Sequence, residues 1–184
     1  MNRRTFLKTT AGAATALTAA SYLRAQGAND AIRVAFIGMG SKVKIGGMGR
    51  NDMKGCRGVP GVRVAALRDV DSANLGYALD ECAKHGEKPE TFADYRKVLE
   101  RNDIDAVWVT TPNHWHALVS IHAAQAGKHV FVQKPVCHNL IEGRRMVQAA
   151  RKYNRVMYSA TLTRAMAGFR EAARFALDGH LGKP

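Results

Sequence analysis

The sequence has few of the residues from which proteins build disulfides or metal centres. Its 184 residues include three cysteines, Cys56, Cys82 and Cys137, which are far apart, odd in number and without C-x-x-C spacing. That pattern indicates neither a disulfide framework nor a metal site. We therefore expect three free thiols that are buried or partly buried, and no metal ligands among the functional residues.

Long hydrophobic runs are also missing. No stretch is long and apolar enough for a strong transmembrane span, so we expect no stable membrane span. Internal repeats, linkers and low-complexity tracts are absent as well. With 46% hydrophobic and 23% charged residues, the composition is typical of a globular protein of one domain, two at most.

Acidic residues are scarce. Fifteen acidic residues face 28 basic ones, for a net charge of +13, of which four charges lie in residues 1–25. The nine that remain come from basic residues scattered along the chain rather than gathered in one block. We favour an ordinary basic, solvated surface over a nucleic-acid interface, and expect no nucleic-acid partner.

The N-terminus has the pattern of an export signal. The pair Arg3-Arg4 followed by Thr-Phe-Leu-Lys resembles a twin-arginine signal, with Asn2 where Ser or Thr is usual, and an Ala/Thr-rich run follows. We assign residues 1–27 to this signal, which predicts an exported or periplasmic protein that is folded before export. The alternative is an amphipathic helix that begins the fold.

Strand-like and helix-like segments alternate along the rest of the chain. This alternation predicts an α/β fold with a doubly wound parallel sheet and helices on both faces, in which ligands bind beyond the carboxyl ends of the strands. The expected strands are 31–37, 62–68, 105–111, 129–133 and 156–159, and the expected helices are 49–58, 71–85, 95–101, 115–126, 139–153 and 168–178.

A glycine-rich stretch follows the first expected strand. Gly38 and Gly40 fit the start of a G-x-G-x-x-G dinucleotide fingerprint, but the third glycine is not at its usual place. If residues 41–46 are set aside, Gly49 completes the fingerprint, and Asp69 then follows it at the customary interval of 20 residues. Both observations predict a phosphate-binding loop that carries a six-residue insertion. The alternative is a structural glycine-rich loop.

In the cofactor interpretation, Gly38 and Gly40 allow the tight turn and the close approach of the backbone, and Gly49 allows close packing of helix on strand. The helix N-terminus then faces the pyrophosphate. Asp69 would bind the adenosine ribose hydroxyls and favour NAD over NADP, a preference that Arg68 would soften. A plain surface acid is the alternative for Asp69.

Two further strand ends carry chemically useful side chains. In VTTPNHWHA, Pro112 ends the strand, Asn113 is expected to cap the next helix, and His116 lies in its first turn. In FVQKPV, Lys134 stands at the end of a strand, where its ammonium group can give a proton to a sugar or ketone oxygen during hydride transfer. By position alone, a surface lysine is the simpler interpretation.

Taken together, the motifs IGMG, DVD, TPNHWHA, AGKHVFVQKP and EGRRMVQAARKY resemble the glucose–fructose oxidoreductase/inositol dehydrogenase (Gfo/Idh/MocA) family over essentially all of residues 31–184. The resemblance implies a nicotinamide cofactor, NAD or NADP, held by an N-terminal Rossmann domain, and a sugar-like substrate. By position in these motifs, the implied cofactor-binding residues are Gly38, Gly40, Gly49, Asp69, Thr111, Pro112, Asn113, His116, Gln133 and Lys134.

The resemblance also implies individual roles. Lys134 matches the lysine of the family's E-K-P motif, which lies beside the nicotinamide and the substrate oxygen, and is the expected catalytic residue. Gln133 replaces the motif's glutamate, which removes a negative charge beside that lysine. Arg164 matches an arginine that relatives place near the substrate.

The resemblance further implies a Rossmann domain over 31–158 and only the beginning of a second, α+β domain over 159–184. Without the substrate wall and oligomer interface of relatives, we expect a chain of the sugar or inositol dehydrogenase type that binds nucleotide but is catalytically incomplete. A non-enzymatic truncated remnant or nucleotide-binding module is the first alternative. An NAD-dependent glycosidase relative is the second, which the presence of Lys134 disfavours.

Overall fold

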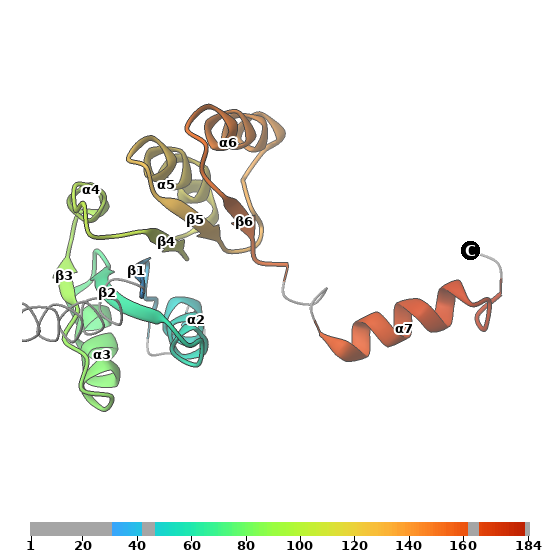
Figure 1. Ribbon diagram of the computed structural model, residues 1–184, viewed down its shortest axis with the longest axis horizontal. Helices are drawn as coiled ribbons and strands as arrows, with labels where there is room; N and C mark the ends of the chain where they lie inside the picture. The colour runs from blue at the N-terminus through green and yellow to red at the C-terminus, as the bar shows by residue number, and fades with distance from the viewer. Residues whose placement is uncertain (1–30, 42–46, 162–165, 183–184) are drawn as a thin grey trace, which may run out of the picture.

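Six short strands form a single parallel sheet in the order β3-β2-β1-β4-β5-β6, as Figure 1 shows for the computed structural model. The structure describes residues 31–41, 47–161 and 166–182. The strands are β1 (Ile32–Ile37), β2 (Val62–Arg68), β3 (Glu90–Phe92), β4 (Ala106–Val109), β5 (His129–Val132) and β6 (Met157–Ser159). The predicted doubly wound α/β fold is confirmed.

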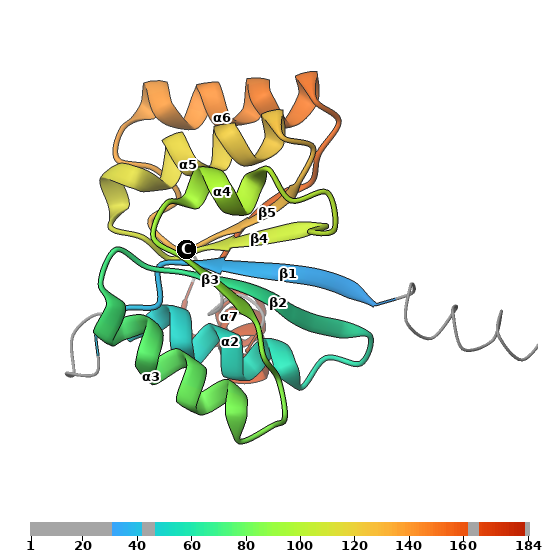
Figure 2. The same ribbon diagram turned by 90° about the vertical axis from the view of Figure 1, so that its left-hand side faces the viewer.

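Helices cover both faces of the sheet (Figure 2). One face carries α2 and α3, and the other carries α4, α5 and α6. Their bounds are α2 (Met48–Arg57), α3 (Ser72–Ala83), α4 (Tyr95–Leu99), α5 (Asn113–Gln125) and α6 (Leu140–Lys152), and α7 (Ala167–Leu177) follows β6. This is the arrangement that apolar parallel strands require, because both of their faces must be removed from water.

Each face of the sheet has its own hydrophobic core. Ile37, Val107 and Val132 point toward α4, α5 and α6, whereas Phe36 and Leu67 pack with α2 and α3. All five side chains are fully buried. The alternation along each strand therefore sends successive side chains into opposite cores, which explains why the strands read as continuous apolar runs.

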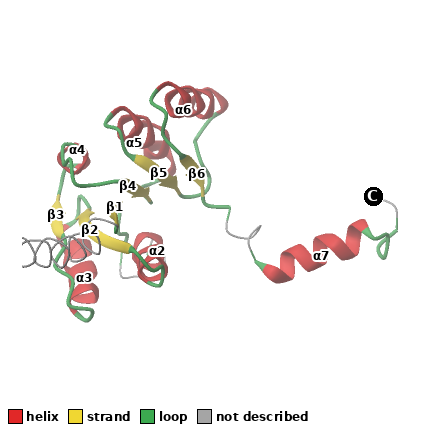
Figure 3. Cartoon of the chain, viewed as in Figure 1, coloured by secondary structure: helices red, strands yellow, loops and turns green. Residues whose placement is uncertain are grey.

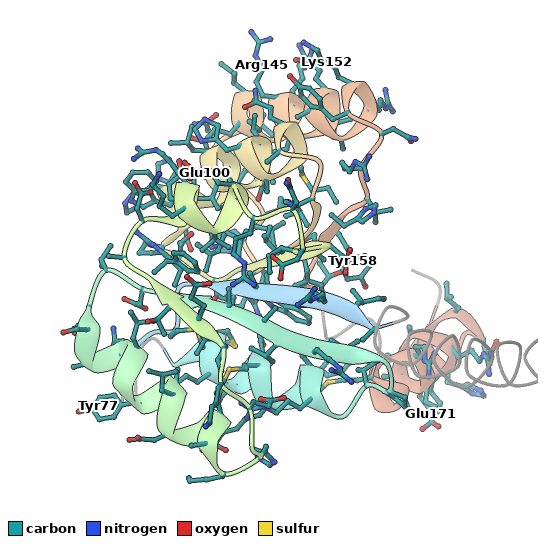
Figure 4. The ribbon with its side chains drawn as sticks, turned by 60° about the vertical axis from the view of Figure 1, so that its left-hand side comes forward. Tyr77, Glu100, Arg145, Lys152, Tyr158 and Glu171 are labelled. Carbon is teal, nitrogen blue, oxygen red and sulfur yellow. The ribbon has the colours of Figure 1, made fainter. Side chains whose placement is uncertain are left out.

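The half of the sheet formed by β4, β5 and β6 is open on the face that carries α2. Trp108, Phe131 and Tyr158 stack in a row across these strands, with ring centroids 3.8 Å and 5.5 Å apart. Tyr158 is 54% exposed, and Figure 4 labels it on the outermost strand. Helix α7 stands apart from the sheet and has no buried residue.

Two local details differ from the sequence expectations (Figure 3). Strand β3 was not predicted, because three residues with one apolar side chain carry too little pattern. The prediction that Asn113 caps α5 is wrong: Pro112 is the N-cap residue, and Asn113 is the first residue of the helix. Asp71 caps α3, since its carboxylate accepts a hydrogen bond from the Ala73 amide.

Candidate functional site

A cleft of about 660 Å³ opens at the carboxyl edge of the sheet. It lies where the strand order reverses between β1 and β4, the place where α/β sheets of this kind bind ligands. The ends of β1, β2, β4 and β5 all contribute to it. Its lining residues are Gly38, Gly40, Ser41, Met48, Arg68, Asp69, Val70, Asn74, Thr110, Thr111, Pro112, Asn113, His116, Gln133 and Lys134.

The turn after β1 depends on its glycines. Gly38 has φ +96° and Gly40 has φ +72°, values that residues with a side chain rarely adopt. A Cβ atom on Gly38 would also lie 2.9 Å from the backbone of Thr110 and Thr111, which follow β4. The chain therefore passes close to the neighbouring strand end only because no side chain stands between them.

Gly49 is the second residue of α2 and permits the closest contact of the site. A Cβ atom there would lie 2.0 Å from the Gly38 carbonyl oxygen and 2.7 Å from the Thr110 hydroxyl. This confirms the prediction that Gly49 allows close packing of helix on strand, even though six residues separate it from the usual spacing. Of the predicted insertion, residues 42–46 lie outside the described residues.

Asp69 has a second task that the sequence did not reveal. Its side chain is buried, and one carboxylate oxygen accepts hydrogen bonds from the amides of Met39 at 2.7 Å and Gly40 at 3.2 Å. The other accepts from the Asp71 amide at 3.0 Å and the Asn74 amide group at 3.4 Å. Asp69 thus holds the glycine turn in place from the end of β2, and its role toward a ribose stays a prediction.

Arg68 lies beside Asp69 at the rim of the cleft. Its Nε donates to the Ala93 carbonyl at 2.9 Å, and its guanidinium carbon lies 5.9 Å from the centroid of the Tyr95 ring. Burial lowers the pKa of Arg68, while the nearby carboxylates of Asp69 and Asp94 oppose this shift. The guanidinium group is therefore fixed over the β3–α4 segment.

The segment between β4 and α5 presents one buried group without a protein partner. The Thr111 hydroxyl is buried in the cleft wall and makes no hydrogen bond to any described residue. His116 is also buried, and its two ring nitrogens lie 2.7 Å from the carbonyl oxygens of Thr111 and Pro135. His116 thus ties the strand ends of β4 and β5 together rather than projecting freely toward a ligand.

Lys134 is exposed and lines the cleft. Within the described part of the chain, its ammonium group forms no hydrogen bond or ion pair with another side chain, whereas its amide donates to the Gln133 side-chain oxygen at 3.0 Å. Gln133 is buried, and its Nε2 donates to a carboxylate oxygen of Asp52 at 2.8 Å. The lysine therefore faces the cleft from a backbone segment that is held on its inner side.

The donor groups and open space of the cleft fit a dinucleotide. No side chain caps the N-terminus of α2 among the described residues, and its first turn carries no acidic residue. An uncapped helix N-terminus beside a glycine turn is a favourable place for a phosphate. The Thr111 hydroxyl, which is buried and has no hydrogen-bond partner among the described residues, is consistent with this ligand.

The structure brings most of the predicted site residues together. Nine of the ten predicted cofactor-binding residues line the cleft, and Gly49 lies behind it as a packing residue. Arg164 lies outside the described residues. Sequence reasoning missed Asp52, which nothing in the chain marks as a partner of Gln133 before the fold is known.

Other kinds of site find less support in the described residues. There, no three His, Cys, Asp or Glu side chains gather as a metal centre would require. All three cysteines are free, with Cys56 and Cys82 buried and Cys137 partly buried, which confirms that prediction. No helix among residues 31–41, 47–161 and 166–182 has the length and hydropathy to cross a membrane.

Curated relatives match the chain over part of their length. A glycosyl hydrolase family 109 protein from Shewanella baltica is 33% identical over 128 residues, and an alpha-N-acetylgalactosaminidase from Shewanella oneidensis is 30% identical over 128 residues. Each match covers 67% of this chain but 27% of the relative. The chain thus spans about a quarter of the length of these relatives.

Solved structures with the same fold include several dehydrogenases. Myo-inositol 2-dehydrogenase from Lactobacillus plantarum matches with a TM-score of 0.70 and 25% identity, over 83% of this chain and 43% of that one. The WlbA dehydrogenase from Chromobacterium violaceum, in complex with NADH and UDP-GlcNAcA, matches with a TM-score of 0.68 and 25% identity, over 81% and 40%. KijD10, a 3-ketoreductase from Actinomadura kijaniata in complex with NADP and TDP-benzene, matches with a TM-score of 0.69 and 25% identity, over 81% and 43%.

The family comparison covers most of the chain. The family model described as "Oxidoreductase family, NAD-binding Rossmann fold" matches residues 32–161, which contain every strand of the sheet and the whole cleft. The chain therefore belongs to the Gfo/Idh/MocA oxidoreductase family and contains its NAD-binding Rossmann fold.

Proposed function

We propose that this chain is the nucleotide-binding part of a nicotinamide-dependent oxidoreductase that acts on a sugar-like substrate. The observation that carries the proposal is the single cleft in which the glycine turn, Asp69, Thr111 and Lys134 meet. The family membership and the sugar-nucleotide and inositol enzymes among its structural neighbours support this substrate class.

The proposed orientation follows from the chemistry of the strand ends. The pyrophosphate lies at the N-terminus of α2, the adenosine ribose lies toward Asp69, and the nicotinamide lies toward Lys134. The bound dinucleotide supplies the hydride chemistry. Toward the substrate, Lys134 holds the proton that is exchanged with a hydroxyl or carbonyl oxygen, and Thr111 offers its unpaired hydroxyl to the cofactor.

For the choice of cofactor we propose NAD over NADP. The buried carboxylate of Asp69 places a negative charge at the end of β2, where a 2′-phosphate would be repelled. Arg68 is held by the Ala93 carbonyl and the Tyr95 ring, so it would bind a 2′-phosphate more weakly than a free guanidinium group would. We expect NADH to bind at least about tenfold more tightly than NADPH.

Titration with NADH, followed by the enhancement of nicotinamide fluorescence, tests the proposal on the full chain. We expect saturable binding that NAD⁺ displaces. Replacement of Lys134 by Met should leave the affinity within about threefold, because one exposed lysine contributes little to holding a dinucleotide. A chain that is folded by circular dichroism but does not bind NADH at millimolar concentration would contradict the proposal.

A second candidate is a glycosidase that uses NAD in transient oxidation of the sugar. The curated relatives favour it, since those matched at 30–33% identity include a glycosyl hydrolase family 109 protein and an alpha-N-acetylgalactosaminidase. Lys134 favours the dehydrogenase. Incubation with NAD⁺ and a nitrophenyl N-acetylgalactosaminide separates the two: release of nitrophenol without accumulation of NADH indicates the glycosidase, whereas NADH formed in proportion to oxidised sugar indicates the dehydrogenase.

We also propose export by the twin-arginine route, supported by the pattern of residues 1–27. Fusion of this segment to a reporter protein tests it by cell fractionation. The Arg3→Lys/Arg4→Lys variant should retain the reporter in the cytoplasm. Equal export of the variant and the parent would refute the assignment.

A further inference from the structure

Asp52 joins α2 to the ends of two strands, and one of them leads into residues 133–135, the lysine segment, which contains Lys134. One of its carboxylate oxygens accepts two hydrogen bonds, from the Trp108 indole Nε1 at 2.9 Å and from the Gln133 Nε2 at 2.8 Å. Trp108 is on β4, and Gln133 directly follows β5. Asp52 itself belongs to the helix that begins at the glycine turn.

Gln133 links Asp52 to Lys134, which lines the cleft. Its side-chain oxygen accepts the hydrogen bond from the Lys134 amide at 3.0 Å, so both ends of the buried amide group are engaged. On the far side of the segment, the Pro135 carbonyl oxygen lies 2.7 Å from His116 Nδ1. Residues 133–135 are therefore held by α2 through Asp52 and by α5 through His116.

The pairing of Asp52 with a glutamine has an electrostatic reason. An amide can donate to the carboxylate, whereas a glutamate at position 133 would bring two carboxylates to hydrogen-bond distance in a partly buried place. Two like charges so close cannot both stay ionised without a large cost. A carboxylate at position 52 therefore requires a neutral hydrogen-bond donor, and not a second carboxylate, at position 133.

We propose that Asp52 is a positioning residue, which sets the place of Lys134 in the cleft through Gln133 and couples it to the phosphate-loop helix. The inference rests on the proposed function only for the role of Lys134 in proton transfer. The contacts themselves exist without any ligand. Because Asp52 belongs to α2, we expect a displacement of α2 on binding of a phosphate group to displace residues 133–135 as well.

A charge exchange between the two positions tests the pairing. Asp52→Asn alone keeps an oxygen that accepts from both Trp108 and Gln133, so we expect NADH affinity within about threefold of the parent. Gln133→Glu alone sets two carboxylates against each other and should raise the dissociation constant for NADH about tenfold, with a lower urea midpoint. In Asp52→Asn/Gln133→Glu the new amide donates to the new carboxylate. The dissociation constant for NADH should then return to within about threefold of the parent value, and the urea midpoint should return close to that of the parent.

The indole of Trp108 provides a spectroscopic readout that a merely structural role would not move. Trp108 does not line the cleft, yet its N–H donates to Asp52. We expect its indole ¹H–¹⁵N signal, assigned with Trp108→Phe, to shift when NADH saturates the full chain. In Asp52→Ala, which removes the carboxylate that joins the Trp108 indole to α2, the shift should fall to less than about half at equal saturation.

The outcomes separate this inference from the proposed function. If NADH does not bind, the proposed function fails, and the urea midpoints of the single and double variants still decide whether Asp52 and Gln133 are paired. If NADH binds but Gln133→Glu equals the parent, or the double variant is no better than Gln133→Glu, the positioning role is refuted. An unchanged Trp108 signal on NADH saturation refutes the coupling to α2.

Discussion

Replacement of Gly49 by alanine is the sharpest test of how the phosphate-binding turn is built. The new Cβ atom would lie 2.0 Å from the Gly38 carbonyl oxygen, whereas ordinary contacts begin at 3.4 Å. The neighbour is backbone and cannot rotate away. Helix α2 must therefore move by about 1.4 Å relative to β1, or the turn after β1 must distort.

The cost can be estimated from similar overpacked sites. Insertion of a methyl group into a closely packed contact typically costs about 1–3 kcal/mol, and we expect the upper end because the new methyl group meets a backbone oxygen. Gly55 is the matched control, since it lies in the same helix and a Cβ atom there meets nothing within 4 Å. Gly55→Ala should stabilise the protein by about 0.5–1 kcal/mol, because alanine loses less backbone entropy in a helix.

Urea unfolding followed by circular dichroism measures both free energies, and NADH titration below the transition measures binding. Gly49→Ala should unfold at lower urea and bind NADH at least about tenfold more weakly, while Gly55→Ala should bind as the parent does. Equal stability of the two variants would refute the packing argument. A destabilised Gly49→Ala that binds NADH normally would show that the N-terminus of α2 does not hold the pyrophosphate.

Three further predictions concern single side chains. Asp69→Asn keeps the size but leaves one oxygen to accept hydrogen bonds, so the glycine turn should loosen, the dissociation constant for NADH should rise about tenfold in fluorescence titration, and the preference over NADPH should shrink. His116→Ala should cost about 2–4 kcal/mol in urea unfolding, because it opens a cavity and removes the ring that joins the Thr111 and Pro135 carbonyl oxygens, whereas the exposed His114→Ala should change stability by less than about 0.5 kcal/mol. The hydrogen bond from Arg101 lowers the pKa of Asp103 to about 2 from 3.8, so its stabilising contribution is present above pH 4 and disappears as the pH falls toward 2. Asp103→Asn should therefore reduce the dependence of the urea midpoint on pH over that range, and an unchanged dependence would contradict this.

The extent to which the fold was predictable varies with the length of each pattern. Five of the six strands and all the described helices after the glycine turn were expected, because long apolar runs and helical spacing need no knowledge of neighbours. Strand β3 was not predicted, since its three residues form a strand only by pairing with β2. The predicted cap at Asn113 is one residue too late, because α5 already begins at Asn113 and Pro112 is its N-cap residue.

The candidate site shows the same division. The spacing of Gly38, Gly40, Gly49 and Asp69 by itself determined where a phosphate turn should lie and which residue should pack the helix on the strand. This was possible because glycines at a turn are required by local backbone geometry, whatever the rest of the fold does. The alternation of strands and helices predicted a parallel sheet, whose carboxyl ends lie at one edge, so the meeting of the strand ends was also predictable.

Only the tertiary structure decided which side chains share hydrogen bonds across these strand ends. Asp69 supports the glycine turn, His116 joins β4 to β5, and Asp52 pairs with Gln133 from 81 positions away. Such pairs depend on distances between elements that are remote in the chain, and no spacing rule encodes them. The sequence alone thus determined the kind of site, and the packing of α2 and α5 against the sheet decided how its residues are held.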